Sequence, residues 1–185
     1  MKKKLAIFDF DGTLFDTVSA NWASYAAALK PYGVSITLEY FIANCYGRYY
    51  KEFLPPLLSD PAAIEAVHKE KSALFPRFLG EIRENQALFS LMSDLRPAYH
   101  TALVTTAARG SVLAILEHFH RKDMFDLILA QEDVPRKKPA PDGFLLAMEH
   151  FGISPENSMI FEDSPEGIAA ARAAGAPFLL VKDIL

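Results

Sequence analysis

The chain has one cysteine, Cys45, among its 185 residues, and this excludes an internal disulfide. Its five histidines and single cysteine form no group with the spacing of zinc ligands, and His118 and His120 make only an isolated His-x-His pair. Neither a disulfide framework nor a zinc site of the usual kind is therefore expected.

Long hydrophobic runs are also missing. The longest stretch without a charged side chain, residues 17–29, is shorter than the roughly 20 apolar residues of a membrane span, and it contains polar residues. The lysines at positions 2–4 precede an apolar run that ends at Asp9, too soon for the hydrophobic region of a signal peptide. We expect a cytoplasmic protein with no membrane partner.

Positive charge is not in excess. Nineteen Lys and Arg against twenty-three Asp and Glu give a net charge of -4. This argues against the broad basic surface that nucleic acids need, and no nucleic-acid partner is expected. A small anionic substrate stays compatible with this charge, because a local site can be positive inside a mildly acidic protein.

What the sequence does contain is typical of a folded domain. The chain is 51% hydrophobic and 12% aromatic, with a mass of 20.6 kDa. That length is enough for one sizeable core with room for an insertion, and too short for two independent domains of usual size. We find no internal repeat or low-complexity tract.

Short apolar runs alternate with helical segments over most of the chain. Strands are predicted at residues 4–10, 100–105, 125–130, 158–161 and 178–181. Helices are predicted at residues 109–119, 142–151 and 165–174. In the second of these, Asp142 is expected to cap the first turn, and Leu145, Met148 and Phe151 to share one face.

This alternation predicts an α/β fold, a Rossmann-like parallel sheet with strand order 3-2-1-4-5. In such a sheet, ligands bind beyond the carboxyl ends of the strands, where the connections leave in opposite directions. Reactive residues are therefore expected at the ends of the first, second and fourth strands.

One region breaks the alternation. Between residues 18 and 84 the strand-like runs disappear, and helices are predicted at residues 19–30, 38–45, 49–54 and 62–74. We interpret residues 18–84 as a helical domain inserted between residues 1–17 and residues 85–185.

The first candidate reactive residues are Asp9 and Asp11. They lie in the segment FDFDGTLFD, at the end of the first predicted strand. Side chains two apart in an extended segment share a face, so both carboxylates can approach one site. Two close carboxylates repel each other unless a cation lies between them. Oxygen ligands without a nearby His or Cys favour Mg2+ over zinc.

FDFDGTLFD resembles the first motif of the haloacid dehalogenase (HAD) superfamily, in the phosphatase-like branch with a small helical cap that includes the β-phosphoglucomutase and phosphoglycolate phosphatase types. Three further motifs follow in family order: ALVT gives Thr105, KPAPD gives Lys138, and MIFEDSPEGIAAARAAG gives Glu162 and Asp163. The resemblance covers roughly residues 4–181.

The resemblance implies phosphoryl transfer through an aspartyl-phosphate. Asp9 would be the nucleophile, and Asp11 would protonate the leaving alkoxide and later accept a proton from water. The implied cofactor is Mg2+, held by the Asp9 carboxylate, the Asp11 backbone carbonyl and Asp163, with Glu162 at its edge or one layer behind.

The remaining motif residues would bind the phosphoryl group. Thr105 would donate a hydrogen bond to a phosphoryl oxygen, and Lys138 would balance the charge of the transition state. Lys138 is preferred over Lys137 because the following proline favours an extended backbone there. Gly12 and Thr13 are expected to form the turn and the backbone cradle around the phosphate.

The resemblance identifies residues 18–84 as a cap and residues 1–17 and 85–185 as the catalytic core. Arg48 lies in the segment that resembles the family's cap specificity loop and is the candidate substrate contact, although it is equally compatible with a surface arginine at a helix start. Asn85-Gln86 stands where family members often have Pro-Gly. A monomer or a homodimer is expected.

The predicted function is a Mg2+-dependent phosphatase acting on a small phosphorylated metabolite, such as a sugar phosphate. A sugar phosphomutase of the β-phosphoglucomutase type and a non-catalytic binding module are the alternatives. A haloalkanoic acid dehalogenase is disfavoured by Asp11 and by the paired acids Glu162 and Asp163, since dehalogenation needs no metal.

Overall fold

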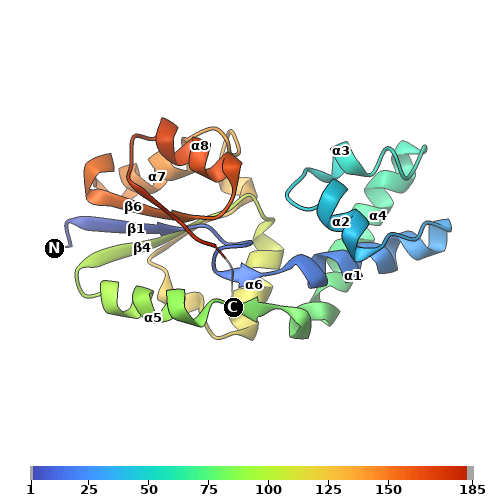
Figure 1. The fold of residues 1–185 in the computed structure, drawn as a ribbon, viewed down its shortest axis with the longest axis horizontal. Coiled ribbons are helices and arrows are strands. Elements are labelled where there is room, and N and C mark those ends of the chain that lie inside the picture. Colours follow the sequence, from blue (N-terminus) through green and yellow to red (C-terminus); the bar gives the residue numbers. More distant parts are fainter. Residues whose placement is uncertain (1, 183–185) are drawn as a thin grey trace. The chain divides into compact units, whose positions relative to one another are not determined.

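A computed structural model describes residues 2–182 and divides the chain into two compact units. One unit comprises Met1–Asp16 and Arg83–Leu185, and the other comprises Thr17–Ile82. The first is built on a parallel sheet and the second on helices alone (Figure 1). That the helical unit acts as a cap stays a prediction.

The sheet of the first unit has five strands in the order β5-β4-β1-β6-β7. The strands are β1 (Lys4–Phe8), β4 (Tyr99–Val104), β5 (Leu127–Leu129), β6 (Ser158–Glu162) and β7 (Phe178–Leu180). Each neighbouring pair is parallel. Counted along the chain within this sheet, the order is 3-2-1-4-5, so the predicted α/β topology is confirmed.

Helices cover both faces of this sheet (Figure 1). On one face lie α7 (Asp142–Phe151) and α8 (Pro165–Ala173), and on the other lie α5 (Gln86–Leu95) and α6 (Arg109–His118). The central strands are buried from both sides, which explains why they read as continuous apolar runs. Ile7, Val104 and Ile160 from three strands pack with Phe144 of α7 in one core cluster.

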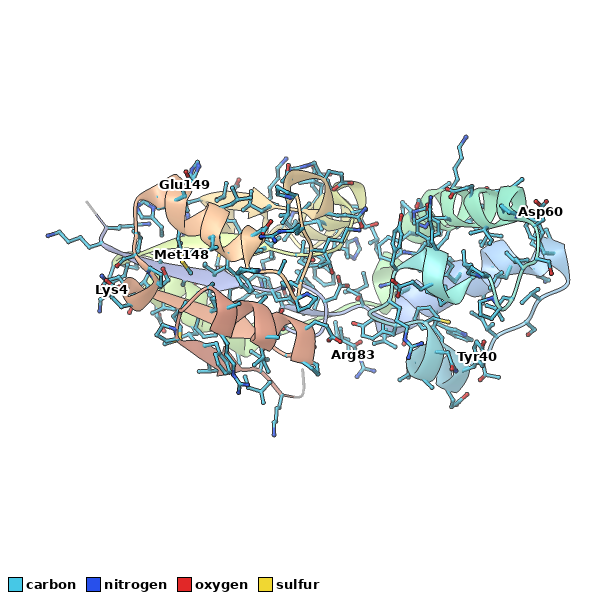
Figure 2. All side chains as sticks on the ribbon, turned by 90° about the horizontal axis from the view of Figure 1, so that it is seen from above. Lys4, Tyr40, Asp60, Arg83, Met148 and Glu149 are labelled. Atoms are coloured by element: carbon cyan, nitrogen blue, oxygen red, sulfur yellow. The ribbon has the colours of Figure 1, made fainter. Side chains whose placement is uncertain are left out.

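The buried face of α7 differs from the predicted one. Met148 faces the core whereas Glu149 points away from it (Figure 2). Phe144 and Ala147 are also buried, and Phe151 packs partly buried against the core as predicted, while Leu145, which was predicted to share this face, is 42% exposed. The buried side chains of α7 therefore begin at Phe144, one residue before the predicted Leu145.

The prediction that Asp142 caps α7 is wrong. Pro141 occupies the N-cap position and no side chain caps the helix. Both carboxylate oxygens of Asp142 instead accept from the guanidinium of Arg136, at 2.9 and 2.8 Å. A planar guanidinium matches a carboxylate with two parallel hydrogen bonds, and this pairing occupies the group that would otherwise cap the helix.

Two features of the first unit were not predicted. The short strands β2 (Phe15–Asp16) and β3 (Arg83–Glu84) pair antiparallel where the chain leaves and re-enters this unit. Two-residue strands carry no periodic pattern that a sequence could reveal. The other feature is α5, whose Leu88, Phe89 and Met92 are buried.

The second unit has four α-helices in the described residues: α1 (Val18–Leu29), α2 (Leu38–Asn44), α3 (Tyr50–Phe53) and α4 (Pro61–Leu74). Two 3-10 segments, Lys30–Tyr32 and Phe75–Glu81, extend α1 and α4. Tyr25, Phe41 and Val67 belong to a separate core cluster within this unit. Side chains of Thr37 and Asp60 cap α2 and α4. Across residues 2–182, no helix has both the length and the apolar character needed to cross a membrane.

Candidate active site

The register of the sheet brings two acidic residues together at the carboxyl ends of neighbouring strands. Phe8 of β1 pairs with Phe161 of β6, and their rings stack with centroids 4.6 Å apart. The next residues along the two strands are Asp9 and Glu162, and the Asp9 backbone N–H donates to the Phe161 carbonyl at 2.9 Å. Parallel pairing thus sets the two carboxylates side by side.

A third carboxylate joins them. Asp9, Glu162 and Asp163 each offer an oxygen, and these atoms lie within 4.8 Å of one another. Asp9 is 7% exposed and Glu162 is fully buried. These residues come from the two predicted acidic motifs, more than 150 positions apart in the sequence.

Lys138 reaches this cluster from the segment before α7. Its ammonium donates to Asp9 Oδ1, to Glu162 Oε1 at 2.6 Å and to the Val104 carbonyl at 3.2 Å. The ammonium also lies 5.1 Å from the ring centroid of Phe144. The Lys138 ammonium thus contacts two carboxylates of the cluster.

Burial and charge act in opposite directions in this cluster. Burial raises the pKa of Asp9 well above its usual value, although the ammonium of Lys138 opposes the rise. Burial also raises the pKa of Asp163. For Lys138, burial lowers the pKa, but the carboxylates of Asp9 and Glu162 outweigh burial and the net pKa is raised.

Three carboxylates and one ammonium leave a formal charge of -2 when all are ionised, that is -3 + 1. Such an excess of buried negative charge is unfavourable unless a cation balances it. The donors are all oxygen, which suits a hard divalent ion such as Mg2+. The residues present therefore fit a divalent metal.

The second oxygen of Glu162 is held by the start of α8. Glu162 Oε2 accepts from the Ser164 backbone N–H at 2.8 Å and from its hydroxyl at 3.0 Å. The same hydroxyl accepts from the Gly167 N–H at 3.0 Å and so caps the helix. A Cβ on Gly167 would collide with the Glu162 carboxylate. No contact of Ser164 or Gly167 with the acidic cluster was predicted, although Ser before Pro is a helix-start signal.

The turn after β1 contacts the other acid. The Thr13 hydroxyl donates to Asp163 Oδ1 at 2.8 Å, and Thr13 is fully buried. Gly12 has φ +85°, and a Cβ there would lie 2.7 Å from Asp163 Cγ. These two residues thus pack against a candidate metal ligand. Their role in a phosphate cradle stays a prediction.

Thr105 and Asp11 lie at the same edge of the sheet. Thr105 directly follows β4, is 3% exposed, and accepts from the Ala107 N–H at 3.0 Å through its hydroxyl. Asp11 lies two residues after Asp9 and forms an isolated bridge with Phe15. It is only partly buried, unlike Asp9.

Arg48 belongs to the other unit. It is exposed, and its backbone N–H donates to the Cys45 carbonyl at 3.1 Å. Its predicted contact with substrate stays a prediction.

Known proteins are similar to this chain in sequence and in fold. The chain is 29% identical to the fructose-1-phosphate phosphatase YqaB of Escherichia coli (strain K12), over 91% of either protein. It is 30% identical to the protein CbbY of Rhodobacter capsulatus, over 97% of this chain and 86% of that protein. A crystal structure of CbbY from Rhodobacter sphaeroides in complex with phosphate superposes with a TM-score of 0.84 and 26% identity, over 97% of this chain and 86% of that one.

The sequence profile of one family matches nearly the whole chain, from residue 6 to residue 181. The match includes Asp9, Thr105, Lys138 and the Glu162–Asp163 pair. The chain belongs to the haloacid dehalogenase-like hydrolase family.

Proposed function

We propose that this hydrolase is a Mg2+-dependent phosphatase of small phosphomonoesters, such as sugar phosphates, and that it acts in the cytoplasm as a monomer or homodimer. One observation carries the proposal. Asp9 is a buried carboxylate at a strand end, contacted by Lys138 and within 4.8 Å of two further acids. A nucleophile, a cation and a metal-binding group are what phosphoryl transfer through a carboxylate requires.

The proposed metal ligands are the carboxylates of Asp9 and Asp163 and the backbone carbonyl of Asp11, with Glu162 at the edge of the site. When bound, Mg2+ supplies positive charge that offsets the carboxylates and lets an anionic phosphoryl group approach Asp9. Glu162 already accepts hydrogen bonds on both oxygens, from Lys138 and from Ser164, which supports its place at the edge.

In the first step, an oxygen of Asp9 attacks phosphorus while the bond to the leaving alkoxide breaks. Asp11 donates its proton to that alkoxide. In the second step, water attacks the phosphorus of the aspartyl-phosphate, Asp11 takes a proton from the water, and the bond to Asp9 breaks to release phosphate. The partial exposure of Asp11 suits a residue that exchanges protons with solvent between turnovers.

Lys138 and Thr105 bind the transferring group. The Lys138 ammonium, placed against Asp9 Oδ1, can pair with the equatorial oxygens as their charge shifts. The Thr105 hydroxyl accepts from Ala107 N–H, so its own proton is directed to another acceptor. A phosphoryl oxygen is the acceptor that we propose.

The names of the relatives support the substrate class. One is a fructose-1-phosphate phosphatase, and the CbbY structure holds phosphate. We propose that Thr17–Ile82 acts as a cap that excludes bulk water, with Arg48 as a substrate contact and Gly12 and Thr13 in the phosphate cradle.

Hydrolysis of p-nitrophenyl phosphate tests the proposal with Mg2+, with EDTA, and in Asp9→Asn. We expect EDTA to abolish turnover, and Asp9→Asn to lower kcat by roughly 10^3-fold or more because the nucleophile is lost. Asp123→Asn, an exposed aspartate of a 3-10 turn, is the matched control and should keep the wild-type rate. Equal background rates in all samples would remove the enzymatic interpretation.

A second assay separates hydrolysis from transfer within one substrate. Hexose 1-phosphates are incubated with the protein, and free phosphate is measured against isomerised sugar phosphate. Release of free phosphate supports the phosphatase. An isomerised sugar phosphate with no release of free phosphate indicates a phosphomutase instead.

A further inference from the structure

Asn85 lies between β3 and α5 and binds the turn that follows β1. Its backbone N–H donates to the Leu14 carbonyl at 2.8 Å, and its Nδ2 donates to the Thr13 carbonyl at 3.1 Å. Its Oδ1 accepts from the Leu88 N–H at 3.1 Å and caps α5. One residue thus joins a helix start to two consecutive carbonyls of the FDFDGTLFD segment.

The partners of Asn85 fix the orientation of its amide. A backbone carbonyl only accepts and a backbone N–H only donates, so Nδ2 must face Thr13 and Oδ1 must face Leu88. Turning the amide over would break both hydrogen bonds. The donor directed at Thr13 is therefore specific to asparagine, whereas the cap could equally be made by aspartate.

Thr13 carries this anchoring on to the acidic cluster. Its carbonyl accepts from Asn85, and its hydroxyl donates to Asp163 Oδ1 at 2.8 Å. Thr13 is fully buried, and Gly12 packs against the same carboxylate. A shift of the turn would therefore move the hydroxyl that orients Asp163.

We propose that Asn85 is a positioning residue for the metal site. It fixes the backbone at Thr13 and, through the Thr13 hydroxyl, orients the Asp163 carboxylate toward the metal. The inference rests on the proposed function, because it takes Asp163 as a metal ligand. Groups that orient metal ligands commonly change metal affinity by about 10- to 100-fold when they are removed.

Asn85→Asp tests the inference. The variant keeps an acceptor for Leu88 N–H at a helix N-terminus, where an acid is favourable, but it sets an oxygen against the Thr13 carbonyl. Mg2+ is titrated into the substrate-free protein by calorimetry. We expect the Kd for Mg2+ to rise roughly tenfold or more, and the Mg2+ concentration for half-maximal activity to rise in parallel. The melting temperature without Mg2+ should fall no more than in the control.

The control is Thr37→Ala. It removes a comparable cap, the 3.1 Å hydrogen bond from the Tyr40 N–H, in the other unit. We expect its Kd for Mg2+ to equal that of the wild type. Asn85→Ser is the second variant. Its hydroxyl can still accept from the Leu88 N–H, but the shorter side chain removes the Nδ2 group that donates to the Thr13 carbonyl, and no charge is added. Combining Asn85→Asp with Thr13→Val should weaken Mg2+ binding no further than Thr13→Val alone.

The outcomes separate this inference from the proposed function. A wild-type protein that shows no Mg2+ binding contradicts the proposed metal site itself. A wild-type protein that binds Mg2+, with Asn85→Asp and Asn85→Ser binding it equally well, overturns the role of Asn85 alone. Additive effects of Asn85→Asp and Thr13→Val contradict the path through Thr13.

Discussion

At the scale of single residues, the Lys138 ammonium pairs with the carboxylates of both Asp9 and Glu162. The Lys138 side chain is 9% exposed, and the side chains of its partners Asp9 and Glu162 are 10% and 0% exposed. Removing one partner of a buried ion pair leaves uncompensated charge, which typically costs about 3–5 kcal/mol. For Lys138→Met we expect a fall of that size in the free energy of unfolding without Mg2+, measured by urea denaturation, together with loss of phosphatase activity.

The neighbouring Lys137 provides the control for this prediction, because it is exposed in the same segment. Lys137→Met should change the free energy of unfolding by no more than about 0.5 kcal/mol. Equal effects of the two substitutions would contradict the assignment of Lys138 to the cluster.

Gly167 leaves the space that the Glu162 carboxylate occupies. A Cβ at this position would collide with that carboxylate and displace it from Lys138 and Ser164. For Gly167→Ala we expect a loss of about 1–3 kcal/mol in the free energy of unfolding. A displacement of about 1 Å at the site should also lower kcat by roughly 100-fold. Thermal unfolding and p-nitrophenyl phosphate kinetics check the two effects.

Gly110 of α6 is the matched helical glycine, since nothing lies within 4 Å of a Cβ built there. Gly110→Ala should leave kcat unchanged and raise the free energy of unfolding by about 0.5 kcal/mol, because alanine favours the helix. A Gly167→Ala enzyme with wild-type kcat would show that the Glu162 position does not matter for turnover.

At the scale of elements, sequence predicted what a long apolar pattern can report. The five sheet strands were found because each contains an apolar run, which in the central strands follows from burial on both faces. Helix α5 was missed although Leu88, Phe89 and Met92 form its buried face. Its start signal, Asn85, was interpreted only as a departure from a family pattern. The strands β2 and β3 depend on pairing between distant residues, which no local pattern contains.

Strand β3 is anchored by an ion pair that links several elements. The Arg121 guanidinium, after α6, donates to both oxygens of Glu84 at 2.8 and 2.9 Å and lies 4.9 Å from the ring centroid of Phe89 in α5. Because the pair is partly exposed, we expect Arg121→Ala to lower the free energy of unfolding by only about 1 kcal/mol.

Lysine at the same position cannot form two parallel hydrogen bonds, so Arg121→Lys should recover only part of this loss. Lys122→Ala removes the neighbouring exposed pair with Glu117, 3.6 Å apart, and should change the free energy by less than about 0.5 kcal/mol. Urea denaturation of the three variants checks the order. A loss in Lys122→Ala as large as in Arg121→Ala would contradict the anchoring of β3.

At the scale of the whole molecule, the predicted topology explains why distant motifs meet. Asp9 and Glu162 were predicted as candidates from their motifs, and the parallel register sets them side by side. The contacts of Ser164 and Gly167 with Glu162, and of Asn85 with Thr13, were not predicted. These contacts depend on the exact positions of single atoms. Many sequences with the same pattern of apolar and polar residues would lack them.

The charge of the assembled site predicts how stability depends on pH. Burial raises the pKa of Asp9 and of Asp163 in the folded protein, whereas in the unfolded chain both are near about 3.9. Above that pH the folded state binds more protons than the unfolded one, so stability without metal falls as pH rises through the raised pKa values. Lys138 stays protonated in both states over this range and adds no slope.

Metal binding has the opposite dependence, since ligands must lose their protons before they bind Mg2+. We expect the rise in melting temperature on adding Mg2+ to be small near the ordinary carboxyl pKa of about 3.9 and to increase as the pH rises through the raised pKa values of Asp9 and Asp163. At about 100 times the Kd, Mg2+ should stabilise the folded protein by roughly 2.7 kcal/mol. Differential scanning fluorimetry with Mg2+ or EDTA across this range checks the dependence. Asp163→Asn keeps the shape of the side chain but not its charge, so Mg2+ should raise its melting temperature little at any pH. If Mg2+ raised the melting temperature of the wild type equally at every pH, the coupling of the buried carboxylates to metal binding would be contradicted.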